Sequence, residues 1–98
     1  MSLPLLISRE ARSDIVEAIE WLGEQSSELP SRFRQSPEQT YVSILEYPEM
    51  YPTIHREFRR ALLRHFPYAI FYVIEADAIV IVGVVHQARH PSTWQRRG

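Results

Sequence analysis

The sequence predicts an α+β domain in which two helices pack on one face of an antiparallel sheet, in the order β-α-α-β-β-β. Three observations lead to this prediction. The first half of the chain repeats apolar residues at helical spacing, the second half consists of β-branched and aromatic runs, and prolines stand between the two halves. Because 98 residues are too few for two hydrophobic cores, we expect residues 1–98 to form a single domain.

A short strand and an amphipathic helix are predicted first. Residues 3–7 form an apolar run, and Ser8 after them is a suitable N-cap for a helix. In residues 9–25 the apolar side chains recur three and four positions apart, and acidic residues occupy the other face. We expect Trp21, near the end of this helix, to close the helix pair as a core or core-edge residue. The apolar stripe consists of Ala11, Ile15, Ala18, Ile19 and Leu22.

The second helical segment contains a proline. An apolar stripe from Leu29 to Leu45 is interrupted at Pro37, and residues 36–39 read as a capping box with proline at the first helical position. Either one helix is kinked at Pro37, or two helices abut there, and we expect a kink or a break at residues 35–37. The prolines at 48 and 52 then end the helix.

Strands are predicted for the second half of the chain. Residues 58–66, 68–75 and 79–86 are β-branched and aromatic runs separated by turn residues, which indicates an antiparallel meander. The last two runs are apolar on both faces. The helices can cover one face, so the other face needs the C-terminal tail or a bound partner chain. We expect Trp94, in that tail, to anchor it on the sheet.

The composition argues against several classes of protein. No apolar run approaches the roughly 18 residues of a membrane span, and residues 1–10 lack the pattern of a signal peptide, so we expect a cytoplasmic protein without a membrane partner. Cysteine is absent and the four histidines lack zinc-site spacing, so we expect neither a metal nor a cofactor. The net charge is −1, yet six acids lie in residues 10–28 and eight of the eleven arginines follow residue 33, which indicates a basic C-terminal half.

Two segments of the predicted sheet carry a resemblance to a known family. Residues 59–72, with the sequence RRALLRHFPYAIFY, and residues 80–91, which end in HQARHP, resemble the strand pair, last strand and arginine-bearing tail of the RelE/ParE toxins. The resemblance implies the fold predicted above and a growth-inhibiting toxin of a type II toxin–antitoxin, or plasmid stabilisation, system. It also implies a cognate antitoxin as partner. RelE-like members cleave messenger RNA on the ribosome, whereas ParE-like members inhibit DNA gyrase without being nucleases.

Four residues are candidates for catalysis if the chain is a metal-independent endoribonuclease. Such cleavage needs a group that activates the 2′-hydroxyl, cationic donors for the phosphorane and an acid for the leaving oxygen. By alternation, Arg60 and Arg64 share one face of a strand, while His86 ends the last strand and Arg89 and His90 follow it. In a nuclease, Arg60, Arg64, His86 and Arg89 are expected to converge on one concave patch.

Other features of the sequence argue against a nuclease. No tyrosine follows Tyr72, lysine is absent, and the net charge of −1 is unfavourable for binding ribosomal RNA. Three functions therefore remain open: a non-catalytic gyrase inhibitor, a ribosome-dependent ribonuclease, and an inactive member that only binds an antitoxin. The expected partners are the antitoxin and either DNA gyrase or the ribosome with its message, and a homodimer is the alternative if the sheet covers itself.

Overall fold

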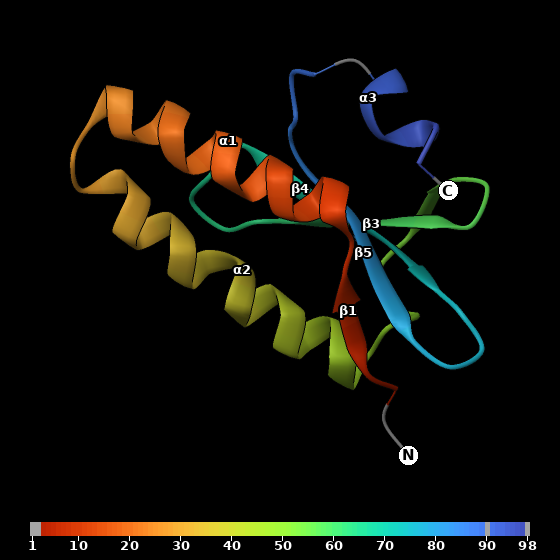
Figure 1. Cartoon of the computed structure of the whole chain (residues 1–98). Coiled ribbons are helices and arrows are strands. Elements are labelled where there is room, and N and C mark those ends of the chain that lie inside the picture. The colour runs from red at the N-terminus through yellow and green to blue at the C-terminus, as the bar shows by residue number, and fades with distance from the viewer. Residues whose placement is uncertain (1–2, 90, 98) are drawn as a thin grey trace.

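The computed structural model describes residues 3–89 and 91–97. Figure 1 shows the α+β arrangement, and the predicted order of one strand, two helices and a meander is confirmed. The elements are β1 (Leu5–Ile7), α1 (Arg9–Gln25), α2 (Leu29–Glu46), β2 (Thr53–His55), β3 (Phe58–Leu62), β4 (Tyr68–Ile74), β5 (Ile79–His86) and α3 (Ser92–Gln95). The short elements β2 and α3 were not predicted. None of the helices in the described residues has the length and apolar character that crossing a membrane requires.

The two long helices form where the apolar periodicity places them. The Ser8 side chain accepts a hydrogen bond from the Ala11 backbone N–H at 3.1 Å, so the predicted N-cap of α1 is confirmed. α2 runs from Leu29 to Glu46 without interruption, and the alternative of two abutting helices at residues 35–37 is therefore wrong. Pro37 removes only one backbone donor from the helix, while buried side chains on both sides of it hold α2 on the core. These side chains are Phe33, Thr40 and Ile44.

The five-stranded sheet of the described residues has the order β1-β5-β4-β3-β2. The meander β3-β4-β5 is antiparallel as predicted, but β1 pairs with β5 in parallel, so the sheet is mixed at that edge. β3 ends at Leu62, earlier than the predicted residue 66. His65 adopts a left-handed backbone with φ of 68°, which turns the chain ahead of Pro67 and stops the strand.

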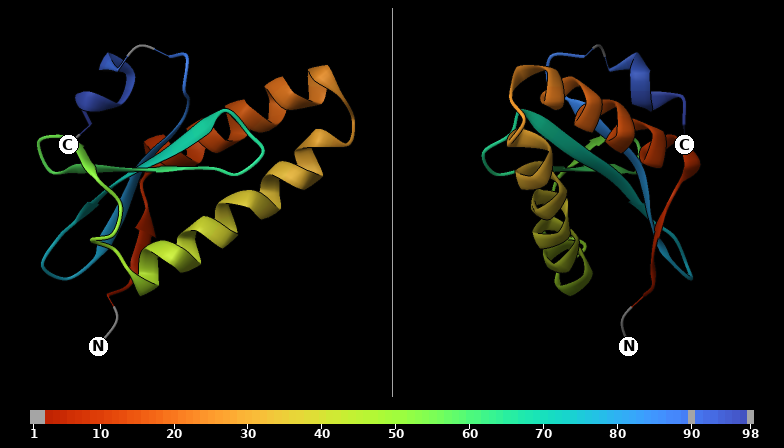
Figure 2. Two further views of the ribbon diagram at one scale, coloured as in Figure 1. Left: turned by 180° about the vertical axis from the view of Figure 1, so that it is seen from behind. Right: turned by 60° about the vertical axis from the view of Figure 1, so that its left-hand side comes forward.

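The two faces of the sheet have different covers (Figure 2). α1 and α2 lie on one face, over a core that includes Phe33, Tyr68 and Tyr72. The opposite face is covered by the C-terminal tail, whose Trp94 stacks on Phe71 with ring centroids 4.1 Å apart and planes at 16°. Trp94 is therefore an anchor of the tail, as predicted. Either the tail or a partner chain was expected to cover this face, and the tail covers part of it.

A β-bulge changes the direction of the side chains along β5. Phe71 pairs with Gly83 and Tyr72 pairs with Ile81, which leaves Val82 as an extra residue in β5. Ile81 and Val84 consequently both belong to the core under the helices, whereas Val82 and Val85 belong to the core under the tail. Because of this shift, the side chain of His86 points to the helix side of the sheet, where it meets Trp21.

Candidate functional site

A hollow lined by aromatic and charged side chains lies where the C-terminal half of α1 meets the end of β5. Its volume is about 400 Å³. The ring of His86 stands edge-on to Trp21 at 5.9 Å and to Tyr68 at 5.2 Å between centroids. We call this site the aromatic hollow, and it is lined by Asp14, Glu17, Ala18, Trp21, Tyr68, His86 and Arg89.

A tight turn fixes the orientation and the tautomer of His86. Its Nδ1 accepts a hydrogen bond from the Ala88 backbone N–H at 3.0 Å, and its carbonyl accepts one from the Arg89 N–H at 2.9 Å. A backbone N–H can only donate, so the neutral ring carries its proton on Nε2. His86 therefore presents a donor at Nε2, and a role as general base requires breaking the turn at Ala88.

Tyr68 also presents a protonated group. Burial raises the pKa of the Tyr68 hydroxyl above its usual value, while Arg89 acts to lower it and Glu17 to raise it. The hydroxyl is thus neutral at physiological pH and lies within the fields of one cation and one anion. Among the described residues, no three His, Asp and Glu side chains gather as a metal site requires. The hollow combines stacking surfaces, hydrogen-bond donors and both signs of charge, which suits binding more than proton abstraction.

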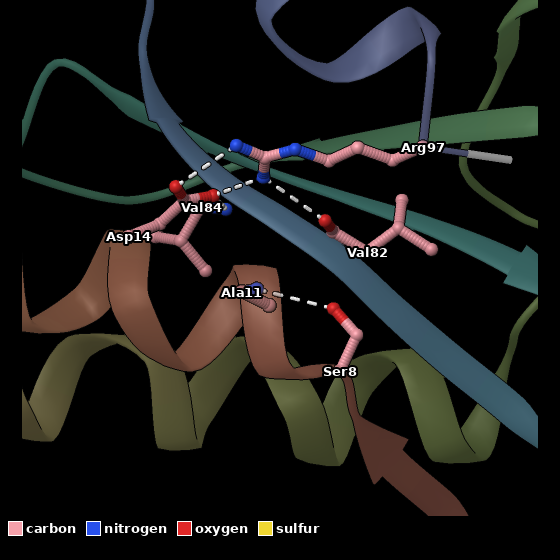
Figure 3. A network of polar contacts seen from close by, with 6 residues as sticks. All are labelled: Ser8, Ala11, Asp14, Val82, Val84 and Arg97. Carbon is pink, nitrogen blue, oxygen red and sulfur yellow. Dashed lines mark hydrogen bonds and ion pairs between the residues drawn. The ribbon is translucent and has the colours of Figure 1, made fainter.

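An ion pair between α1 and the C-terminal tail borders the hollow (Figure 3). Arg97 Nη1 donates to Asp14 Oδ2 at 2.5 Å, and Arg97 Nη2 donates to Asp14 Oδ1 at 3.2 Å. Asp14 also accepts from the Val84 backbone N–H, next to the bulge. Gly83 lies under this pair, since a Cβ there would come within 3.1 Å of Arg97 Nη1. The pair therefore holds the tail against α1 and β5 at once.

The four candidate catalytic residues do not lie together in one hollow. His86 and Arg89 both line the aromatic hollow. Arg64 follows the end of β3 and lines two separate hollows with residues of α2, so the expected alternation with Arg60 does not extend to it. Arg60 pairs with Phe71, whose ring lies under the tail, and therefore points to the opposite face of the sheet from His86. His90 lies outside the described residues.

Several residues of the site were missed or misplaced from the sequence. Trp21 was expected in the core or at its edge, but 45% of its surface is exposed and its ring borders the hollow, so that expectation is wrong. The cause is that β5 ends at His86, beside Trp21, so the sheet covers the indole only in part. The pair of Asp14 with Arg97 joins residues 83 positions apart, and no pattern in the sequence signals it.

Comparison with known proteins identifies the chain at the level of a family. Residues 5–91 match the family described as "ParE toxin of type II toxin-antitoxin system, parDE". A chain of the solved structure titled "Chromosomal ParDE TA system from P. aeruginosa" is similar in fold, with a TM-score of 0.77 and 14% sequence identity over 86% of this chain and 95% of that chain. Among curated proteins, no sequence matches. α3 and Arg97 lie beyond the region that the family match covers.

Proposed function

Because the chain belongs to the ParE toxin family of type II toxin–antitoxin systems, we propose that it is a toxin neutralised by a cognate antitoxin and that it inhibits DNA gyrase without cutting nucleic acid. The family match supports the first part, since a toxin of such a system acts beside its antitoxin in the cytoplasm. Inhibition of DNA gyrase is supported by the resemblance to ParE-like toxins, which act in that way. Such inhibition requires binding to the target and no catalytic group.

The observation that carries the choice of target is the separation of the four candidate catalytic residues. One scissile phosphate has to be reached by a base, an acid and cationic donors at hydrogen-bond distance. Arg60 points to the tail side of the sheet, whereas His86 points to the helix side, and Arg64 lines other hollows. The proton on Nε2 of His86 and the raised pKa of Tyr68 also leave these two side chains unsuited to act as the base.

Ribosome-dependent cleavage of messenger RNA is the second candidate, and one observation favours it. The aromatic hollow places His86 and Arg89 beside the exposed ring of Trp21, and such a ring can stack on an unpaired base. If the chain cuts RNA in this hollow, a single cation has to suffice at the phosphate, and the base has to be a residue outside the four predicted ones. Glu17 is the carboxylate of the hollow that lies outside the ion pair with Arg97.

Induction without antitoxin tests the proposal. The wild-type chain, His86→Ala and Arg64→Ala are expressed while growth, plasmid supercoiling and the integrity of messages at the ribosomal A-site are followed. The expected result is arrested growth with reduced supercoiling and intact messages. Val42→Ala, a change of an exposed residue on α2 outside the hollows, serves as the matched control and should behave as wild type.

Two results contradict the proposal. Messages that are cleaved in the wild type but intact with a folded His86→Ala or Arg64→Ala chain would make the protein a ribonuclease. Soluble expression without any effect on growth would leave an inactive member that retains the fold and the surface for an antitoxin.

A further inference from the structure

The aromatic hollow is one end of a longer groove. A second hollow of about 340 Å³ shares Asp14, Glu17 and Arg89 with it. A third hollow of about 650 Å³ shares Glu10 and Arg97 with the second. Each hollow is lined by at least one residue of α1, and because neighbouring hollows share residues they adjoin one another at the border between this helix and the C-terminal tail. Together we call them the α1–tail groove.

Both ends of the α1–tail groove offer apolar surface. At one end the exposed ring of Trp21 stands beside Tyr68 and His86. At the other end the floor is made of side chains from β3, β4 and β5 that belong to the core under the tail or pack against it. These are Phe58, Val73, Val80 and Val82. The middle is polar, and the ion pair of Asp14 with Arg97 lines it. An occupant that fits therefore has an apolar side chain at each end and polar residues between them.

The charges at the tail end of the groove indicate which charge the partner carries. Glu10, Glu57 and Glu75 line this end and are exposed. Of the two arginines there, Arg97 is paired with Asp14, whereas Arg56 forms no ion pair among the described residues. The excess of carboxylates favours a partner with Arg or Lys beside its apolar anchor. A second copy of this chain is disfavoured, because both sides of a two-fold interface would carry the same excess of carboxylates.

We propose that the α1–tail groove binds the antitoxin, as one elongated segment with an apolar anchor at each end and a basic residue next to the anchor on Val80. This inference rests on the proposed function, which supplies the partner. From Glu10 to Trp21 the groove follows α1 for roughly 16 Å at 1.5 Å per residue. A segment that follows α1 over this length needs about 11 residues if it is helical and about 5 residues if it is extended.

Calorimetric titration with the antitoxin encoded beside the gene for this chain tests the assignment. Trp21→Ala and Val80→Arg change the two ends of the groove. Tyr47→Ala also truncates an aromatic side chain and Val42→Arg also replaces valine by arginine, in both cases at exposed residues outside the groove. The groove variants are expected to weaken binding by at least about 10-fold, as anchor residues do, and the controls by less than about 2-fold.

A charge reversal tests the basic residue of the partner. Glu75→Arg at the rim of the groove is expected to weaken binding by about 5-fold or more, and to do so chiefly through slower association at low salt. Glu38→Arg, an exposed acid of α2 that lines none of the three hollows, should leave the affinity within about 2-fold of wild type and serves as the matched control. Equal effects of the two reversals would overturn the proposed charge selection.

Hydrogen exchange provides a measurement that needs no variant. Adding the antitoxin to the wild-type chain should protect backbone amides around residues 8–21 and 80–89 more than those of α2. Wild-type affinity in the folded groove variants, or protection confined to α2, would overturn the groove as the binding site while the proposed function stands. An antitoxin that does not bind the wild-type chain overturns both. A wild-type dimer that the groove variants convert to monomer would assign the groove to self-association and overturn the proposal as well.

Discussion

The two faces of the sheet are covered in different ways. On the helix face, α1 and α2 bury a continuous core in which Phe33 is fully inaccessible and meets both Phe66 and Tyr68 edge-on. On the tail face, a helix of four residues places Trp94 on Phe71, and Arg97 holds the tail through its ion pair with Asp14 and its hydrogen bond to the Val82 carbonyl. The two long helices thus cover their face of the sheet completely, whereas the short helix α3 leaves part of the other face uncovered. We therefore expect the helix face to contribute most of the stability, and the less covered border between α1 and the tail is the surface that we propose for the partner.

The largest expected effect is on the free energy of unfolding, which should fall more for a substitution in the helix-face core than for one in the tail. Phe33→Ala should lower the free energy of unfolding by about 3–5 kcal/mol, because it leaves a cavity in a core that cannot open locally. Trp94→Ala should cost only about 2 kcal/mol, since the tail can detach while the rest of the fold stays intact. Urea unfolding followed by circular dichroism measures both. Equal losses would mean that the tail and the helices unfold as one unit.

The ion pair that holds the tail should show an asymmetric effect. Asp14→Ala removes the acceptor of the Val84 N–H and the counter-charge of Arg97, which keeps only its hydrogen bond to the Val82 carbonyl, and should cost about 2–3 kcal/mol. Arg97→Ala leaves the bond from Asp14 to Val84 in place and should cost about 1 kcal/mol. Thermal unfolding of the two variants checks the difference. Glu20→Ala, another acid of α1 but an exposed one, is the control and should change little. A larger loss for Arg97→Ala than for Asp14→Ala would be incompatible with this account.

Two tyrosines of the helix-face core should differ by a smaller amount. The Tyr72 hydroxyl donates to the Pro48 carbonyl, and Tyr72→Phe should cost about 1 kcal/mol. The Tyr41 hydroxyl is buried and has no hydrogen-bond partner among the described residues, so Tyr41→Phe should be neutral or slightly stabilising. Urea midpoints of the two variants, measured side by side, provide the check. A clear loss for Tyr41→Phe would indicate an ordered water on that hydroxyl.

The smallest effect appears only in alkaline solution. Burial raises the pKa of Tyr41 and of Tyr72 to about 12, while an unfolded tyrosine titrates near about 10. Both folded pKa values are above the unfolded value, so the stabilisation is fully present below pH 10 and is lost as the pH rises from 10 to 12. Urea midpoints should therefore fall across this range and fall less in the double variant Tyr41→Phe, Tyr72→Phe. An identical decline in both proteins would contradict these assignments.

The long elements were predictable because each contains enough residues to display a period. Residues 9–25 cover several helical turns, and β4 and β5 are long runs with strand character. β2 and α3 span only three and four residues, which is too few for periodicity to appear. Pro37 was misleading, since the local rule against proline inside a helix was outweighed by the burial of its neighbours.

The candidate site was only partly predictable, for a geometric reason. His86 and Arg89 are three positions apart across a turn, so their placement in one hollow follows from local sequence. Arg60 was expected in the same patch because one phosphate has to be reached by all four residues, but the extra residue Val82 turns the end of β5 so that His86 lies on the opposite face from Arg60. The contact of Asp14 with Arg97 depends on the whole path of the chain, and the local sequence carries no sign of it.

A supercoiling assay with purified components tests the proposed target most directly. Purified DNA gyrase, relaxed plasmid and ATP are combined with the wild-type chain, first alone and then with its antitoxin, in the absence of ribosomes. The account predicts that the chain alone blocks the introduction of supercoils and that the antitoxin restores them. Full supercoiling in the presence of a folded chain that arrests growth in cells would contradict gyrase as the target and would point to the ribosome instead.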